Sequence, residues 1–236
     1  MATNIDTRVP LDFNPAVVQG LDGYAESTAH LVGETETALS EAYQGIAQVY
    51  DARAAADRNP VWNEAARVIE TYNLAERLEG KLNKRIFTAR TTLERGIATL
   101  EQELSAPVTT KASHPVASEI RAYAKGLSTG ERMSLIRGAI AEGDETTATA
   151  LLGAPPYLSG LDGKMQALLT REFHERMNPE AAKRVRLMKA ADALLADRHS
   201  ALGRALEKAI GAPPAKVRAL REAKTAAERH FVMQAS

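Results

Sequence analysis

The feature that most constrains this chain is a regular row of aliphatic residues in its first half. From residue 78 onward, apolar side chains recur at steps of four, four, three, four, four, three and four residues. Such steps place side chains on one face of an α-helix, and an eleven-residue repeat suits nearly straight packing against a neighbour. The row predicts one long helix whose association seam is Leu78, Leu82, Ile86, Leu93, Ile97, Leu100 and Leu104, with Ala89 between them.

A second row of apolar and small residues precedes this one, between Val17 and Val49, with steps that mostly alternate between four and three. Because only the turn-forming segment 57–60 separates the rows, the sequence predicts a long antiparallel hairpin over 14–104. Two helices of about 40 residues would each be roughly 60 Å long. A hairpin this thin cannot bury both rows on itself. Either the C-terminal helices cover the seam, or the seam associates with other chains.

Start and stop signals divide the remainder into helices. Ser128-Thr129-Gly130-Glu131 is a capping box, in which the serine and the glutamate satisfy each other's backbone amides. The tetrapeptide Gly-Ala-Pro-Pro occurs at 153–156 and at 211–214. Glycine after a helix followed by proline ends that helix, and the sequences beyond the two copies differ, so the tetrapeptide marks helix ends. Asn-Pro pairs predict three helix starts, at Asn14-Pro15, Asn59-Pro60 and Asn178-Pro179.

Composition supports an all-α fold, because aromatic residues make up only 5% of the chain and a sheet protein would use more of them. The sequence predicts an extended arm over 1–13, the hairpin, a linker rich in proline, serine and threonine over 105–115, and a helical region over 116–236. The fold expected is therefore a long antiparallel helical hairpin followed by a bundle of shorter helices. These helices are expected at about 115–126, 129–142, 145–152, 162–177, 179–210 and 214–232.

Within this region, 129–152 is expected to form a helical hairpin that turns at Gly143. Its two apolar faces would meet across the turn. The facing residues would be Leu135, Ile136 and Ile140 on one side, and Ala148, Leu151 and Leu152 on the other.

Catalytic and metal-binding signatures do not emerge from the residue pattern. The chain has no cysteine. The stretch from His174 resembles the first half of a zinc-protease motif, but Asn178 stands where the second histidine would be required. No nucleophile elbow occurs. We therefore expect no enzyme activity, no catalytic residue, no metal and no cofactor. The N-terminus lacks the apolar core of a Sec signal, and no apolar run is long enough to span a bilayer, so no membrane partner is expected.

Charge is unevenly distributed along a chain whose formal net charge is zero. Residues 1–57 contain nine acidic and two basic residues, whereas 179–229 contain twelve basic and six acidic ones. The two ends could attract each other, or the basic segment could contact a polyanion such as nucleic acid, with a solvated or acid-paired helix face as the alternative. The candidate polyanion contacts are Lys183, Arg184, Arg186, Arg218, Arg221 and Lys224.

Two stretches of the second half carry a family resemblance. ERMSLIRGAIAEGDETTATALLGAPPYLSGL, from Glu131, and FHERMNPEAAKR, from Phe173, resemble segments of uncharacterised helical proteins that tailed phages and prophages of proteobacteria encode. The resemblance covers about residues 118–195. It implies a phage context in the host cytoplasm or the virion, and it brings no activity and no functional residue.

These observations lead to two expected functions. The first is a non-enzymatic structural or assembly protein that acts through helix–helix contacts, such as a virion, scaffold or connector-associated component. Its partners would be further copies of itself or other phage structural proteins. The second is a nucleic-acid-associated or regulatory binding module that uses the basic C-terminal helices.

Overall fold

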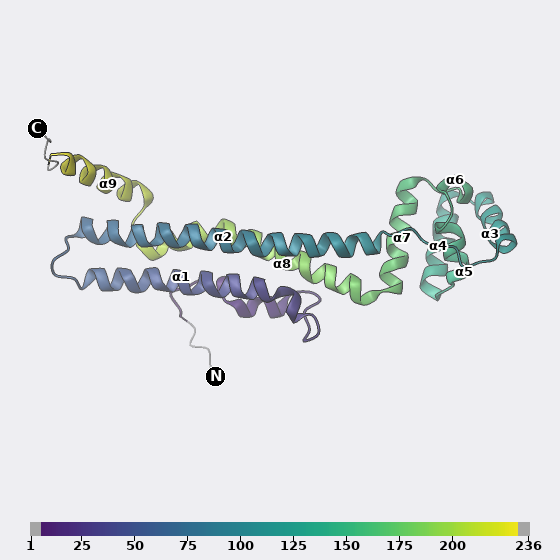
Figure 1. The fold of residues 1–236 in the computed structure, drawn as a ribbon, viewed down its shortest axis with the longest axis horizontal. Helices are drawn as coiled ribbons and strands as arrows, with labels where there is room; N and C mark the ends of the chain where they lie inside the picture. The colour runs from purple at the N-terminus through teal and green to yellow at the C-terminus, as the bar shows by residue number, and fades with distance from the viewer. Residues whose placement is uncertain (1–5, 231–236) are drawn as a thin grey trace, which may run out of the picture. The chain divides into compact units, whose positions relative to one another are not determined.

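The computed structural model describes residues 6–230, and they form an all-α fold in which no strand occurs. Three short 3-10 helices come first, and they are followed by two long helices, five shorter ones, a third long helix and one more short helix (Figure 1). The elements are η1 (Leu11–Phe13), η2 (Pro15–Gly20), η3 (Ala29–Val32), α1 (Gly33–Asp57), α2 (Glu64–Leu104), α3 (His114–Gly126), α4 (Thr129–Glu142), α5 (Glu145–Leu152), α6 (Pro156–Ser159), α7 (Gly163–Met177), α8 (Pro179–Ile210) and α9 (Pro214–Arg229).

The chain divides into two compact units. Unit 1 contains the residues up to Glu94 and those from Leu187 onward, and unit 2 contains Arg95–Arg186. Both divisions fall inside helices, in α2 and in α8, and not in the segment 105–115 that the sequence marks as a linker. The domain boundaries expected from the sequence therefore differ from the limits of the two compact units. The reason is that the C-terminal half of α8 packs with the hairpin helices.

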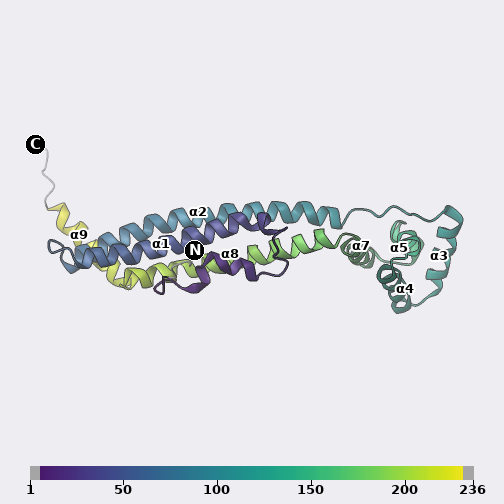
Figure 2. The same ribbon diagram turned by 90° about the horizontal axis from the view of Figure 1, so that it is seen from below.

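Unit 1 is built on α1, the first part of α2 and the last part of α8, which lie alongside one another (Figure 1, Figure 2). Gly45 on α1 lets α2 approach, since a Cβ there would lie 3.0 Å from Leu82 Cδ1. Arg90 on α2 donates through Nε to Asp192 on α8 at 2.7 Å, and this bond holds the Arg90 pKa above its usual value. Buried aliphatic residues fill the space between the helices, including Leu39, Ile46, Ile86, Leu195 and Leu202.

The N-terminal segment corrects two expectations. The row from Val17 does not begin a long helix: residues 11–32 form 3-10 helices and turns, and α1 begins only at Gly33. A turn with Gly23 at φ 85 separates η2 from η3 and prevents one continuous helix. The described part of the expected extended arm, 6–13, also folds, because Val9 and Phe13 are buried. Residues 1–5 of that arm lie outside the described residues.

The connection between α1 and α2 corrects one predicted helix start. Asn59 accepts a bond from the Val61 amide at 2.9 Å within the turn and does not cap α2. Asn63 takes that role by accepting from the Ala66 amide at 2.9 Å. The third Asn-Pro pair behaves as expected, because the Asn178 side chain accepts from the Ala181 amide at the start of α8.

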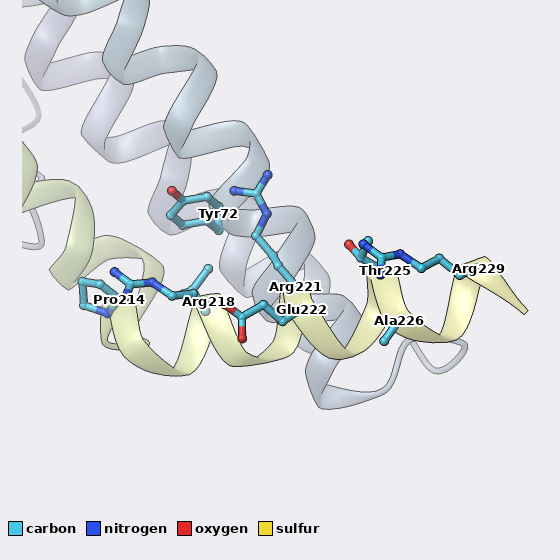
Figure 3. Close-up of a pocket in the computed structure, with 9 residues that line it drawn as sticks. Tyr72, Pro214, Arg218, Arg221, Glu222, Thr225, Ala226 and Arg229 are labelled. Carbon is cyan, nitrogen blue, oxygen red and sulfur yellow. The ribbon is translucent and has the colours of Figure 1, made fainter.

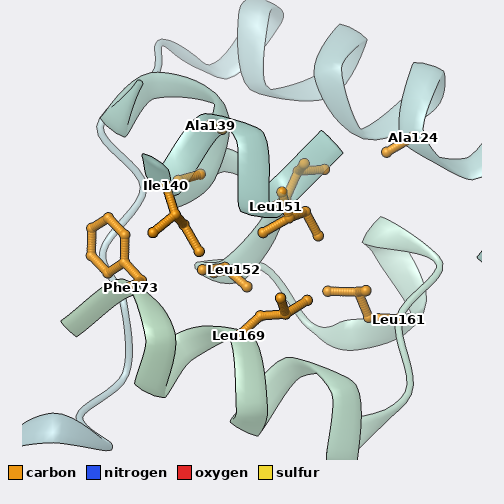
Figure 4. Close-up of a cluster of buried hydrophobic side chains, with 10 residues drawn as sticks. Ala124, Ala139, Ile140, Leu151, Leu152, Leu161, Leu169 and Phe173 are labelled. Carbon is orange, nitrogen blue, oxygen red and sulfur yellow. The ribbon is translucent and has the colours of Figure 1, made fainter. Parts of the chain in front are cut away.

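A large apolar cluster fills the space between helices of unit 2. Ile136 and Ile140 of α4 and Leu151 of α5 belong to it, as expected for a helical hairpin over 129–152, and Leu169 and Phe173 of α7 complete it. Figure 4 shows the side chains of Leu151, Leu152 and Leu169 gathered between α4, α5 and α7. The capping box at the start of α4 is present with both reciprocal bonds. A short helix that the sequence did not indicate, α6, lies before α7.

The segment 105–113 is not a free linker. The Lys111 amide donates to Thr149 Oγ1 at 2.9 Å, and His174 Nε2 lies 2.8 Å from the Ala106 carbonyl oxygen. Val108 packs against the apolar cluster. These bonds satisfy backbone groups that an exposed linker would leave to water, so the segment forms part of unit 2.

Arg132 is a buried cation of unit 2, with 8% of its surface exposed. Its Nε donates to the Ala124 carbonyl at 2.8 Å and its Nη2 to the Leu127 carbonyl at 2.7 Å. Further bonds reach the carbonyls of Lys125 and Gly160. The guanidinium thus satisfies the open carbonyls at the end of α3, where a positive charge also interacts favourably with the helix dipole.

Candidate docking face at the start of α2

The predicted association seam is largely covered by the chain itself. Leu82, Ile86 and Leu93 are buried in unit 1. In unit 2, Leu104 is buried in a cluster with Ala181 and Val185 of α8, and Leu100 packs against that cluster. Leu78 and Ile97 are partly buried. The alternative in which C-terminal helices cover the seam therefore holds, because α8 contributes to this cover.

The six candidate polyanion contacts do not form one group. Lys183, Arg184 and Arg186 lie on the part of α8 that belongs to unit 2, and the other three lie on α9 in unit 1. On α9, two of the three meet acidic residues of α2: Arg221 Nη1 lies 3.5 Å from Glu76 Oε1, and Lys224 Nζ lies 3.8 Å from Glu70 Oε1. This part of the basic face is acid-paired.

A further ion pair joins the start of α9 to the start of α2. Lys216 Nζ donates to Glu64 Oε1. The bond stabilises the carboxylate, and it lowers the pKa of Glu64 below its ordinary value. The Arg221 guanidinium also lies over the Tyr72 ring, 5.2 Å from its centroid, where a cation–π attraction is expected.

The apolar part of the contact between α9 and α2 is thin. Val217 is the buried residue of α9, and Leu220 is half-buried. A cavity of about 560 Å³ lies on one flank, between Tyr72 and a row of α9 residues that includes Arg218, Arg221 and Arg229. Figure 3 shows Arg221 reaching from α9 towards Tyr72 on α2.

Two more cavities open on the same stretch of α2. One of about 290 Å³ is lined by Ala65, Ala66 and Ile69 of α2 and by Leu220 and Ala223 of α9. The other, of about 280 Å³, is lined by Trp62 and Thr71 together with alanines of α1. We call the set that borders these three cavities, with the residue that precedes it, the α2 docking face: Val61, Trp62, Ala65, Ala66, Ile69 and Tyr72.

The α2 docking face has the composition of a protein contact surface. Val61 is 85% exposed and Trp62 36% exposed, beside concave apolar walls. Tryptophan, tyrosine and arginine are the residues that most often dominate the energy of protein interfaces. Alanines at Ala65 and Ala66 allow the backbone of an incoming helix to come close. The arrangement can hold apolar side chains within a rim of charges.

Sequence reasoning missed this face although part of its signal is visible. Val61-Trp62 follows a turn and belongs to neither apolar row, which indicates an exposed apolar pair. Two of the three cavities could not be anticipated, because they form where Tyr72 and Ile69 meet residues of α9, far later in the chain.

Other kinds of site find no support in the described part of the chain. Between residues 6 and 230, no group of three or more histidine, aspartate or glutamate side chains is placed to hold a metal ion. Within the same range, no helix combines the length and the apolarity required to cross a membrane.

Comparison with known proteins gives no match: no family model, no curated protein and no solved structure is similar to this chain. The fold class established here is all-α, and any function has to be argued from the residues themselves.

Proposed function

We propose that this protein is a non-enzymatic assembly component that binds its partner through helix–helix contacts at the α2 docking face. The observation that carries the proposal is that one short stretch, from Trp62 to Tyr72, lines three cavities while Val61 and Trp62 remain exposed beside them. The contact differs from the one first expected, since the long seam after Leu78 is occupied within the chain.

Physical arguments favour association at this place. Exposed apolar residues next to concave walls gain free energy when a partner removes them from water. A fixed helix surface loses little conformational entropy on binding, because its backbone is already ordered. Ion pairs around the rim would then select partners with matching charges.

The biological setting proposed is a tailed phage, on the strength of the resemblance carried by residues 118–195. There the protein would serve as a virion, scaffold or connector-associated component and would act in the host cytoplasm or in the particle. Further copies of the chain and other phage structural proteins are the partners that this setting offers.

Light scattering coupled to size-exclusion chromatography tests the proposal at protein concentrations of about 1–100 μM, where contacts of moderate affinity populate. We expect the wild type to self-associate and Val61→Asp with Ala66→Glu to reduce the mass to that of a monomer. Phe87→Asp is the matched control, because Phe87 is 70% exposed on the same helix and lies outside the face. A monomeric wild type, or an oligomer that only Phe87→Asp dissolves, would contradict the proposal.

A second function, polyanion binding, is favoured by one specific observation. Arg218 and Arg229 line the largest of the three cavities, and neither has an acidic partner among residues 6–230. With Arg221 they form a row on one face of α9 that phosphate groups could contact.

Retention on a nucleic-acid column at increasing salt tests this second function. Arg218→Glu with Arg229→Glu should lower the salt needed for elution, because phosphate contacts release counterions. The control is Arg204→Glu with Lys208→Glu, an equal change of charge on exposed positions of α8. Equal retention of both variants would argue against a site on α9.

A further inference from the structure

The partner of the α2 docking face can be named from the charges around it. We propose that α9 is exchanged between two copies of this chain, so that α9 of each copy docks on α2 of the other. The inference rests on the proposed assembly function and identifies both the partner, a second copy, and the element that it contributes.

Charge complementarity within one sequence supports this exchange. Three glutamates of α2 meet three bases of α9, and the chain therefore carries both halves of one contact. Any second copy presents the same two halves, so each contact made within a chain can be remade between chains, and the exchanged dimer would be symmetric. The pairs are Glu64 with Lys216, Glu70 with Lys224 and Glu76 with Arg221.

The contact between α9 and α2 within one chain is weak. Its ion pairs are exposed, with 44% to 76% of the glutamate side chains accessible, so water and salt screen them. Val217 is the side chain of α9 that the contact buries. Cavities on both flanks show that the two helices do not interlock. Opening this contact therefore breaks few interactions.

Helix α9 needs a surface against which it can pack. A helix of 16 residues is marginal in water by itself, because nucleation is unfavourable and short helices gain little from propagation. A released α9 would thus remain helical only on a partner that offers apolar and acidic groups together. The start of α2 in a second copy offers both.

The connector between α8 and α9 suits exchange. It consists of Gly211, Ala212 and Pro213, and the extended Pro213, with ψ 150, separates the two helices. A connector of three residues spans only about 10 Å. The partner's α2 must therefore lie next to the end of α8, which brings the two α2 docking faces close together.

Complementary charge reversal tests the exchange directly. Variant A carries Glu64→Lys, Glu70→Lys and Glu76→Lys, and variant B carries Lys216→Glu, Arg221→Glu and Lys224→Glu. Neither variant can dock its own α9, because like charges then face each other. In a mixture, α9 of each variant matches α2 of the other, and both contacts of an exchanged dimer are restored.

Native mass spectrometry resolves the outcome, because the two variants differ in mass. We expect A alone and B alone to be monomers and an equimolar mixture to give an A–B heterodimer as the main species. A mixture that stays monomeric overturns the exchange, and so does a variant that dimerises alone as strongly as the mixture. Circular dichroism confirms that each variant is folded before mixing.

Crosslinking provides a second test that does not depend on reversed charges. The chain has no cysteine, so Glu70→Cys in one copy and Lys224→Cys in another are unique attachment points for a bismaleimide reagent. We expect a covalent dimer from the mixture, and Lys84→Cys in place of Glu70→Cys should give much less. No dimer above that control overturns the exchange.

The two proposals fail in different ways. If Val61→Asp with Ala66→Glu dissolves a wild-type oligomer while the A–B mixture remains monomeric, the assembly function stands and the exchange of α9 is wrong. If the heterodimer forms, the exchange stands, and the effect of Val61→Asp on that heterodimer then decides whether the α2 docking face contributes.

Discussion

The two compact units differ in the surroundings of their arginine side chains. In unit 2, Arg132 is buried and donates to four backbone carbonyls, and among residues 6–230 no carboxylate pairs with it. In unit 1, Arg221 is exposed, lies over Tyr72 and meets Glu76 at 3.5 Å. A buried guanidinium fixes the groups around it, because removing it leaves their bonds unmade, whereas an exposed pair is screened by solvent. Unit 2 is therefore expected to be committed to one arrangement, while α9 can change partners.

The repeated Gly-Ala-Pro-Pro shows the same contrast on a smaller scale. Gly153 in unit 2 has an ordinary φ of −81, but a Cβ there would lie 2.7 Å from the Thr149 carbonyl oxygen and 2.8 Å from that of Val108. Gly211 in unit 1 has φ 74, and a Cβ there would meet the guanidinium of Arg53. Close backbone packing requires the first glycine, and a left-handed turn requires the second.

The largest effect is expected for Arg132→Met. It should lower the free energy of unfolding by about 2–4 kcal/mol, because several buried carbonyls lose their donors. Urea denaturation followed by circular dichroism measures the loss, and fluorescence of the single tryptophan, Trp62, reports on unit 1 alone. Arg137→Met, which removes an exposed partner of Glu172, is the control. Equal losses for both variants would show that burial of the Arg132 guanidinium does not make it more important than an exposed arginine of the same unit.

Substitution of the two glycines is expected to give the next largest losses of stability. Gly153→Ala is expected to lower the free energy of unfolding by about 1–3 kcal/mol, since backbone atoms must move to admit the methyl group. Gly211→Ala should cost only about 1 kcal/mol, the penalty of a left-handed alanine, because the flexible Arg53 side chain can turn away. Urea denaturation curves of the two variants show which substitution lowers the free energy of unfolding more. The reverse order would mean that backbone angle matters more here than packing.

A smaller effect concerns the cap of α5. Asp144 accepts from the Thr147 amide at 3.0 Å, and the bonds from Thr147 lower the Asp144 pKa below its ordinary value of 3.8. The carboxylate thus adds stability above that value and loses it as the pH falls through the lowered pKa.

Asp144→Asn separates this charge from the cap. Asparagine still caps the helix, whereas Asp144→Ala should cost about 0.5–2 kcal/mol. We expect the difference between wild type and Asp144→Asn to shrink as urea titrations move from pH 7 to pH 3. A constant difference over that range would show that the charge plays no part.

The smallest effect is expected for α9. Lys224→Gln removes an exposed pair with Glu70 and should change the unfolding free energy by less than about 0.5 kcal/mol. Added salt should reduce even this difference. A loss above about 1.5 kcal/mol would show that α9 is held as firmly as unit 2 and would break the comparison.

Local signals in the sequence predicted much of the fold. The spacing from Leu78 to Leu104 identified α2, Ser128 and Glu131 identified the start of α4, and Asn178 identified the start of α8. Each of these signals acts between residues at most four positions apart on one helix, so a single sequence is enough to interpret it.

Signals that depend on distant packing were misinterpreted. The segment 105–113 has the composition of a linker, yet Thr149 and His174 satisfy its backbone. Residues 17–32 have a helical spacing, but they fold as 3-10 helices and turns beside α1. The α2 docking face was missed for the same reason, because two of its three cavities arise only where Ile69 and Tyr72 meet α9. Association, phage context and the absence of enzyme activity remain predictions.

The division of the chain also has a consequence for the order of folding. Unit 2 is one uninterrupted stretch, Arg95–Arg186, inserted between the two parts of unit 1. On a ribosome its whole sequence is synthesised, and leaves the exit tunnel, before Asp192 emerges, the partner of Arg90 across 102 positions. Unit 2 can therefore fold before the part of α8 that packs on α1 and α2 is available. Because α9 is synthesised long after the acidic row of α2 (Glu64, Glu70 and Glu76), a nascent chain exposes that row until its own α9 emerges, and under the proposed exchange the α9 of another copy can dock there first.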